Sequence, residues 1–157
     1  MALTFREAKE QDVERIVEML ADDVLGKTRE RYEQPLPASY GAAFQAIDAD
    51  PNNELIVAVN GTGRIIGVQQ VTFTPYLTHQ GSWRATIEGV RTDSTVRGQG
   101  IGGQLIRYAI ERAKERGCRL VQLTTDKQRP DALRFYEGLG FTATHEGMKM
   151  KLETTEL

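Results

Sequence analysis

A glycine-rich loop between a strand pattern and a long amphipathic helix is the feature that most limits how this chain can fold. Residues 97–103 read R-G-Q-G-I-G-G and follow the strand-like segment 83–92. The helix that comes next has an apolar face at three- and four-residue steps, made of Ile101, Leu105, Ile106, Ala109, Ile110 and Ala113. A strand pattern at 119–125 completes a strand–helix–strand unit, which predicts two parallel neighbouring strands.

The segments around this unit predict a mixed sheet with helices. Further strands are predicted at 3–7, 54–60, 64–75, 141–147 and 148–153, and N-G-T-G at 60–63 indicates a hairpin. Helices are predicted from about 10 to 24 with Gly26 as the stop, over 39–49 and over 131–140. Because the chain has 157 residues and no internal repeat or linker, we expect a single domain, 1–157.

Composition and charge narrow the classes of function. Twenty basic residues against 22 acidic ones give a net charge of -2, which argues against a nucleic-acid binder. Cys118 is the sole cysteine and the two histidines, His79 and His145, are far apart, so neither a disulfide nor a metal site is expected. The chain shows no membrane-span pattern and no signal-peptide pattern, so we expect a cytoplasmic protein with no membrane partner.

The position of the glycine loop favours a phosphate-binding role over a simple turn. The N-terminus of a helix offers unpaired N–H groups and a partial positive charge, and glycines allow close approach of a phosphate. Gly98, Gly100 and Gly103 also satisfy G-x-G-x-x-G, with Asp126 downstream. We reject a dinucleotide site because T-D-S-T-V separates the glycines from their strand and too little chain follows. A P-loop is rejected because no G-K-[ST] follows.

Two motifs together make the sequence resemble the GNAT superfamily of acetyl-CoA-dependent N-acetyltransferases. Arg97 to Gly102 matches [QR]-x-x-G-x-[GA], and residues 132–141, A-L-R-F-Y-E-G-L-G-F, match the second family motif at the expected separation. The order of the elements over residues 3–152 matches as well. The resemblance implies an α/β (α+β) fold, with a mixed, mostly antiparallel central sheet flanked by helices and a splayed parallel pair formed by its fourth and fifth strands.

The resemblance also implies where acetyl-CoA binds. Its pyrophosphate is expected at Arg97, Gly98, Gln99, Gly100, Ile101, Gly102 and Gly103. Its pantetheine amides are expected to pair with the backbone of Val90, Arg91 and Thr92, as an added strand does. Many family members carry Asn where this chain has Arg129, so a cofactor contact from this position is left open.

Glu88 is the candidate general base, acting directly or through a water. An amine acceptor with a pKa of about 10 arrives protonated, and Glu88 is the one carboxylate between Glu54 and Asp93. Gly89 within the same strand pattern indicates a bulge that directs an N–H at the thioester oxygen. The alternative is a solvent-facing glutamate, or one paired with Arg84 or Arg91.

Tyr136 is the candidate general acid for the coenzyme thiolate, because a phenol matches a thiolate in basicity. The alternative is an aromatic residue at the rim of a helix whose core positions are Phe135 and Leu139. Without the family resemblance, this second interpretation is the better one.

The acceptor cannot be derived from the residues. Small-molecule amines and protein amines both fit, and a homodimer is common for proteins of this kind. Asp22, Asp23, Glu30 and Glu33 border the acceptor in this fold, but a solvated charged face is favoured for them. The rival hypothesis is a non-catalytic acyl-CoA-binding or regulatory module, which would have no reason to retain both Glu88 and Tyr136.

Overall fold

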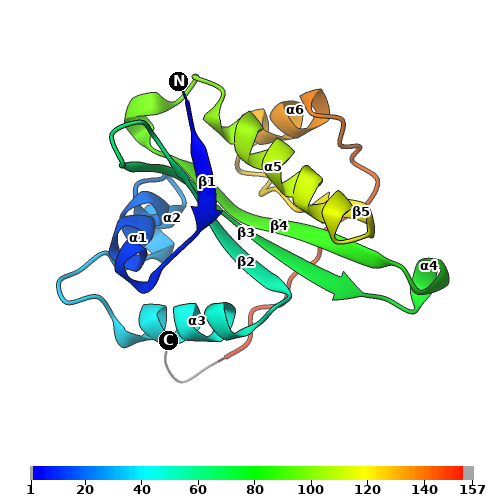
Figure 1. Ribbon diagram of the computed structural model, residues 1–157, viewed down its shortest axis with the longest axis horizontal. Helices are drawn as coiled ribbons and strands as arrows, with labels where there is room; N and C mark the ends of the chain where they lie inside the picture. Colours follow the sequence, from blue (N-terminus) through cyan, green and yellow to red (C-terminus); the bar gives the residue numbers. More distant parts are fainter. Residues whose placement is uncertain (1, 154–157) are drawn as a thin grey trace. The chain divides into compact units, whose positions relative to one another are not determined.

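In the part of the chain that the structure describes, five strands form one sheet in the order β1-β2-β3-β4-β5 (Figure 1). They are β1 (Thr4–Glu7), β2 (Asn53–Val59), β3 (Ile65–Pro75), β4 (Trp83–Thr92) and β5 (Cys118–Leu123). The first three pairings are antiparallel, and β5 runs parallel to β4. The predicted mixed, mostly antiparallel sheet is therefore confirmed.

The structure is a computed structural model that describes residues 2–153, and the chain divides into two units, Met1–Gln122 and Leu123–Leu157. The helices of the first unit are α1 (Val13–Ala21), α2 (Gly26–Arg29), α3 (Ala38–Ala49), α4 (Thr78–Gly81) and α5 (Ile101–Glu115), with short 3-10 turns at Glu10–Asp12 and Ser94–Val96. The second unit contains α6 (Pro130–Gly138). None of the described helices is long and apolar enough to cross a bilayer.

Helices cover both faces of the sheet in the first unit, and strand alternation sorts the apolar residues between them. On one face, α5 packs Ile101 and Leu105 against Ala58 and Ile66. On the other face, α1 and α3 bury Ile16, Met19 and Phe44 against Val57 and Val68. Leu105, Ile106 and Ala109 are fully buried, so the predicted apolar face of α5 is the one that anchors it.

A long hairpin carries β3 and β4 beyond the rest of the sheet, with α4 at its tip (Figure 1). The tip contains two non-glycine residues in the left-handed region, His79 with φ 55° and Gln80 with φ 63°. Leu77 beside them is 98% exposed. The tip is thus a tight turn held outside the apolar core.

The first helix is shorter than its apolar pattern predicts. It ends at Ala21, Gly26 begins α2 instead of stopping α1, and Val24 is 84% exposed. The reason is a local hydrogen bond, because the Asp23 carboxylate accepts from the N–H of Gly26 at 3.0 Å. An aspartate side chain that binds a backbone N–H three residues ahead competes with continuation of the helix.

The two closing strands, 141–147 and 148–153, are wrong predictions for this structure, because neither segment forms regular secondary structure. The alternation that suggested a strand is real, but Met148, Met150 and Leu152 are 92%, 85% and 71% exposed. A strand is stabilised by pairing with a neighbour and by burying one face, and these described residues do neither.

Candidate functional site

The loop between β4 and α5 combines left-handed glycines with the beginning of a helix. Gly98 and Gly100 both lie in the left-handed region, with φ 81° and φ 80°, where side chains with a Cβ are strained. Gly100 caps α5, and the helix hydrogen bonds begin with the N–H of Gln104 on the Gly100 carbonyl at 3.1 Å. The preceding N–H groups of Ile101, Gly102 and Gly103 therefore have no partner within the helix ladder and lie at its positive end.

Asp93 fixes the start of this loop. It caps the 3-10 turn Ser94–Val96, accepting from the Thr95 backbone N–H at 2.8 Å and from the Thr95 hydroxyl at 2.5 Å. The residue is only 6% exposed. A buried carboxylate needs several donors, and Asp93 has them from more than one element.

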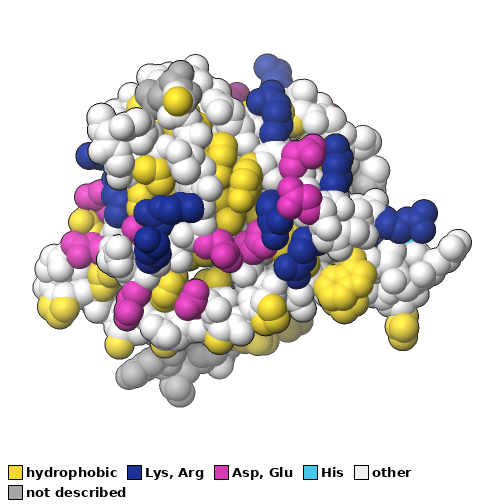
Figure 2. All heavy atoms as spheres, in the orientation of Figure 1, with side chains coloured by type: hydrophobic (Ala, Val, Ile, Leu, Met, Phe, Trp, Pro, Cys, Tyr) yellow, Lys and Arg dark blue, Asp and Glu magenta, His cyan; other side chains and the backbone are white. Residues whose placement is uncertain are grey.

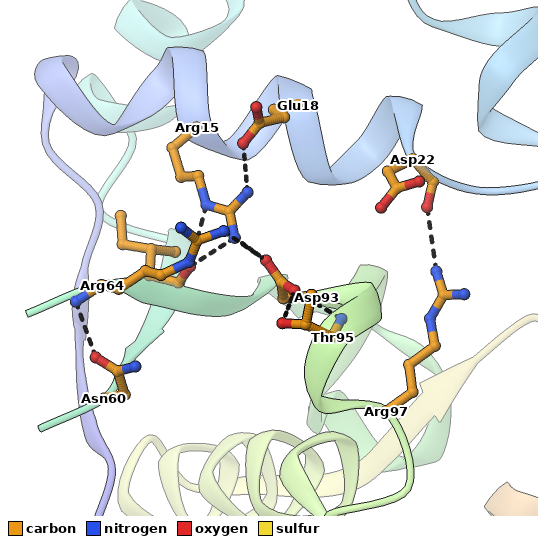
Figure 3. Close-up of polar contacts among 9 residues, drawn as sticks. Arg15, Glu18, Asp22, Asn60, Arg64, Asp93, Thr95 and Arg97 are labelled. Atoms are coloured by element: carbon orange, nitrogen blue, oxygen red, sulfur yellow. Dashed lines mark hydrogen bonds and ion pairs between the residues drawn. The ribbon is translucent and has the colours of Figure 1, made fainter. Parts of the chain in front are cut away.

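Two arginines complete the surroundings of Asp93 (Figure 3). Arg15 of α1 donates to the Asp93 carboxylate, to Glu18 and to the Ile65 carbonyl, and Arg64 donates to Asp93 at 3.1 Å. Hydrogen bonds from Thr95 first, and then from Arg15 and Arg64, hold the pKa of Asp93 well below its usual range despite the opposing effect of burial. Asp93 thus stays ionised and ties α1 to the start of the loop.

The segment after α1 contacts the side chains of Arg97 and Arg91, two residues that the family resemblance assigns to the coenzyme, Arg91 through its backbone. Arg97 donates to the Asp22 carbonyl at 3.1 Å (Figure 3). Arg91 lies 3.7 Å from the Asp23 carboxylate, and it donates to the Val90 carbonyl at 2.8 Å. The Asp23 side chain is 11% exposed, so the prediction of a solvated face is wrong for this residue. Its burial follows from these two contacts, with Gly26 and with Arg91.

The bulge predicted at Gly89 is present. Gln70 pairs with Glu88 and Val68 pairs with Arg91, so Gly89 and Val90 stand opposite the single residue Gln69. Gly89 has φ 64°, a left-handed backbone that accounts for glycine here. Val90 consequently packs on the α5 face of the sheet.

Glu88 lies immediately before this bulge and its side chain is exposed. Among the described residues it has no ion-pair partner, and neither Arg84 nor Arg91 pairs with it. The alternative in which Glu88 pairs with Arg84 or Arg91 is therefore wrong for this structure. Glu88 stands as a free carboxylate at a distorted point of β4.

Gln69 is a buried polar residue at the same bulge that the sequence gives no reason to single out. It is fully buried, and its amide donates to the Leu105 carbonyl of α5 at 2.7 Å. Its side-chain oxygen has no partner among the described residues. This hydrogen bond links the β3 residue opposite the bulge to α5, the helix that follows the glycine loop.

Tyr136 belongs to the second unit and lies on α6. Its ring makes edge contacts with Phe135 at 5.0 Å and with Phe141 at 6.0 Å between centroids. Arg129 occupies the N-cap of the same helix. Both residues are thus placed within the second unit, while Glu88 and the glycine loop belong to the first.

Sequence reasoning missed Arg15 and the role of Asp93. Asp93 with Thr95 two residues later is a recognisable turn signature, which the sequence alone could have supplied. Arg15 had no such signal, because its contact with Asp93 joins residues 78 apart in the chain. No group of three or more His, Cys, Asp or Glu side chains in the described part of the chain is arranged to hold a metal ion.

Charges of both signs are intermixed on the face shown in Figure 2, without a field of one sign. This distribution agrees with the small net charge of -2.

Comparison with known proteins gives a family match over most of the chain. The model of the acetyltransferase (GNAT) family matches residues 13–141. An aminoalkylphosphonate N-acetyltransferase of Salmonella typhimurium is 33% identical over 102 residues, and a glucosamine 6-phosphate N-acetyltransferase of Trypanosoma brucei brucei is 36% identical over 91 residues. These alignments cover 65% and 58% of this chain, and 65% and 60% of the respective relatives, so the chain spans less than two thirds of either.

A solved structure covers more of the chain. The crystal structure of a protein from Bacillus halodurans described as a transcriptional regulator is 72% identical and superposes with a TM-score of 0.94. The match covers 96% of this chain and 100% of that one.

Proposed function

Because the chain belongs to the acetyltransferase (GNAT) family, we propose that it transfers the acetyl group of acetyl-CoA to an amine acceptor by direct attack. One observation carries the proposal. The strand with a bulge at Gly89 leads into a loop whose left-handed glycines, Gly98 and Gly100, open onto the N-terminus of α5. An exposed carboxylate and a turn suited to an anion thus lie on one continuous segment of the chain, which supports the proposal.

The residues of the loop fit the pyrophosphate of acetyl-CoA. A Cβ built at Gly98 or Gly100 meets no atom of the described chain within 4 Å, so the space above the loop is open. The N–H groups of Ile101, Gly102 and Gly103 supply donors, and Arg97 and Gln99 supply side chains. The backbone of Val90, Arg91 and Thr92 would hold the pantetheine amides. Acetyl-CoA supplies the thioester that the amine attacks.

Two side chains move the protons in this proposal. Glu88 accepts a proton from the acceptor ammonium, directly or through a water, so that the free amine attacks the thioester carbonyl. A backbone N–H at the Gly89 bulge donates to the carbonyl oxygen as negative charge develops there. Tyr136 donates its phenolic proton to the departing thiolate, and the proton that the attacking nitrogen loses as the amide forms restores the phenol. These roles are supported by the chemistry of the two groups, because a carboxylate without an ion-pair partner can accept a proton and a phenol can donate one.

The acceptor is proposed to be an amine, of a small molecule or of a protein. The two curated relatives are named for acceptors that are small molecules, an aminoalkylphosphonate and glucosamine 6-phosphate. Their names guide the choice of compounds for a first panel.

A second candidate is a module that binds acyl-CoA and regulates without catalysis. The observation that favours it is the description of the 72% identical Bacillus halodurans protein as a transcriptional regulator. Retention of both Glu88 and Tyr136 favours the enzyme.

Calorimetry with acetyl-CoA, followed by a thiol-release assay over an amine panel, separates the two candidates. The enzyme predicts saturable binding and amine-dependent release of the thiol. Tight binding without turnover on any amine would favour the regulatory module, and no binding of acetyl-CoA would contradict both.

A further inference from the structure

The face of the sheet that carries Glu88 becomes a polar platform towards the α4 end of the hairpin. We define the platform by Asn53, Gln70, Thr72, Thr86 and Gln122, which come from β2, β3, β4 and β5. Gln70 and Thr72 both donate to the Asn53 side-chain oxygen at 2.9 Å, and Gln122 donates to the Thr86 hydroxyl at 3.1 Å. All five side chains are uncharged, so the platform itself attracts neither sign.

Arg84 stands on this same face at the far end of the platform. Its guanidinium lies 4.4 Å from the centroid of the Tyr76 ring and donates to His79 Nδ1 at 2.8 Å. A third, longer contact reaches Gln122 Oε1 at 3.4 Å. Contacts from the hairpin tip and from β5 therefore fix the direction of the guanidinium before any ligand is present.

Arg84 contacts Tyr76, His79 and Gln122, whereas three other arginines against the sheet pair with carboxylates. Arg6 pairs with Asp12, Arg15 with Asp93 and Arg112 with Glu54. Among the described residues, Arg84 has no carboxylate within ion-pair distance. A guanidinium held in place with its charge uncompensated is a natural partner for an anionic oxygen group.

The register of β4 places Arg84 and Glu88 on the same face of the sheet. Pairing with β3 is unbroken from Thr74 with Arg84 to Gln70 with Glu88, and the bulge begins only after Glu88. Residues 84, 86 and 88 consequently project from the same face. Four residues of strand separate the two Cα atoms by about 13 Å, with the Thr86 position between them.

From this geometry we propose that Arg84 binds an anionic oxygen group of the acceptor whose amine is deprotonated by Glu88. The acceptor class is an amine that carries a phosphoryl or carboxylate group several bonds away, because the two ends of the platform are too far apart for adjacent groups. This assignment rests on the proposed acetyl transfer and adds the substrate class to it. Tyr76 and His79 act as positioning residues for the guanidinium.

The decisive test uses acceptors that differ in one group. Glucosamine 6-phosphate and glucosamine differ only in the phosphoryl group, and 6-aminohexanoate and hexylamine differ in a carboxylate. We expect wild-type kcat/KM to be higher for the charged member of at least one pair. Arg84→Gln should lower that preference about tenfold to a hundredfold, mainly through KM.

Arg84→Lys and Lys114→Gln are the controls. Arg84→Lys keeps the charge but loses the fork geometry, so part of the preference should remain. Lys114→Gln removes one positive charge from the exposed end of α5 and should leave the preference intact. Circular dichroism and thermal melts establish that each variant folds, and a folded Arg84→Lys keeps the test valid if Arg84→Gln does not fold.

Binding is measured separately from turnover, by calorimetry of each pair with the protein saturated with coenzyme A. Tighter binding of the charged member that is lost in Arg84→Gln supports the anion site, whether or not any amine is acetylated. Absence of acetylation for every amine would contradict the proposed function and not the anion site. Equal binding and equal turnover of both members overturn the Arg84 assignment, as does a preference that Arg84→Gln leaves unchanged. A preference only in the glucosamine pair identifies the anion as a phosphoryl group, and a preference only in the 6-aminohexanoate pair identifies it as a carboxylate.

Discussion

At the scale of single residues, Glu88→Gln tests the proposed base. The amide keeps the size of the side chain but cannot accept the proton, so we expect kcat/KM to fall about 100-fold or more at pH values below the pKa of the acceptor. The loss should shrink as the pH approaches the pKa of the amine, where free amine is abundant. A pH–rate profile measures both effects. An unchanged profile would remove Glu88 from the mechanism, and Glu111→Gln on the exposed face of α5 is the matched control.

Tyr136→Phe tests the proposed acid. The ring contacts with Phe135 and Phe141 persist in the variant, so packing is conserved while the phenolic proton is lost. We expect turnover to fall by at least about tenfold with little change in the affinity for acetyl-CoA. Steady-state kinetics and calorimetry together make the comparison. Equal losses in both quantities would indicate that the hydroxyl serves structure rather than proton transfer.

Asp93→Asn tests the carboxylate that ties α1 to the loop. Replacing one partner of this buried network should lower the free energy of unfolding at pH 7 by about 3 kcal/mol, because Arg15 loses its ion pair. The pKa of Asp93 lies below its ordinary value of 3.8, so its contribution is present above that pH. It is lost as the pH falls further towards the lowered pKa.

The difference in stability between wild type and Asp93→Asn should therefore narrow from pH 5 to pH 2. Urea denaturation at several pH values measures it. A difference that stays constant with pH would mean that the charge of Asp93 is not what holds the loop.

Residue-level prediction from sequence succeeded where the signal was local. The bulge at Gly89 and the position of Glu88 before it followed from one glycine in a strand pattern, and both are present. The surroundings of Arg84 could not be foreseen, because they depend on the fold of the hairpin tip and on Gln122 of a later strand. The catalytic roles of Glu88 and Tyr136 remain predictions.

At the scale of elements, the glycine loop is the piece whose backbone carries the proposed function. Gly100→Val places a β-branched side chain at φ 80°, a conformation that such residues avoid. We expect the affinity for acetyl-CoA to fall at least about tenfold while circular dichroism remains close to wild type, because the loop lies outside the apolar core. Calorimetry measures the affinity.

Gly61→Val is the matched control for the loop. Gly61 lies in the hairpin turn between β2 and β3, and a Cβ there also meets nothing within 4 Å. Acetyl-CoA affinity should be unchanged in this variant. Retained affinity in Gly100→Val would count against the loop as the pyrophosphate site.

Elements with a long, strongly periodic pattern were predictable, and short or unpartnered ones were not. The pattern for α5 and the hairpin joining β2 to β3 gave the right structure because each pattern matched a buried face. Segment 148–153 has an equally regular alternation, yet its apolar side chains are exposed. Alternation of apolar and polar residues indicates which side chains would share a face, but a strand forms only where a neighbouring strand pairs with the segment.

At the scale of the whole molecule, the sequence predicts one domain over residues 1–157, while the backbone contacts divide the chain after Gln122. The proposed mechanism needs both units, since Glu88 and the glycine loop belong to the first and Tyr136 to the second. If the proposed roles hold, we expect the chain to unfold as one cooperative body when acetyl-CoA is bound.

Saturating acetyl-CoA should accordingly raise the melting temperature in a single transition. At 100 times the dissociation constant, binding to the folded state adds about 2.7 kcal/mol to the free energy of unfolding. For a chain of this size, that corresponds to a rise of about 5–11 °C. Differential scanning calorimetry measures the shift and compares the calorimetric with the van't Hoff enthalpy. Gly100→Val should lose most of the shift, whereas Gly61→Val should keep it. Two separate transitions, only one of which responds to acetyl-CoA, would contradict a single domain and would place coenzyme binding in one unit alone.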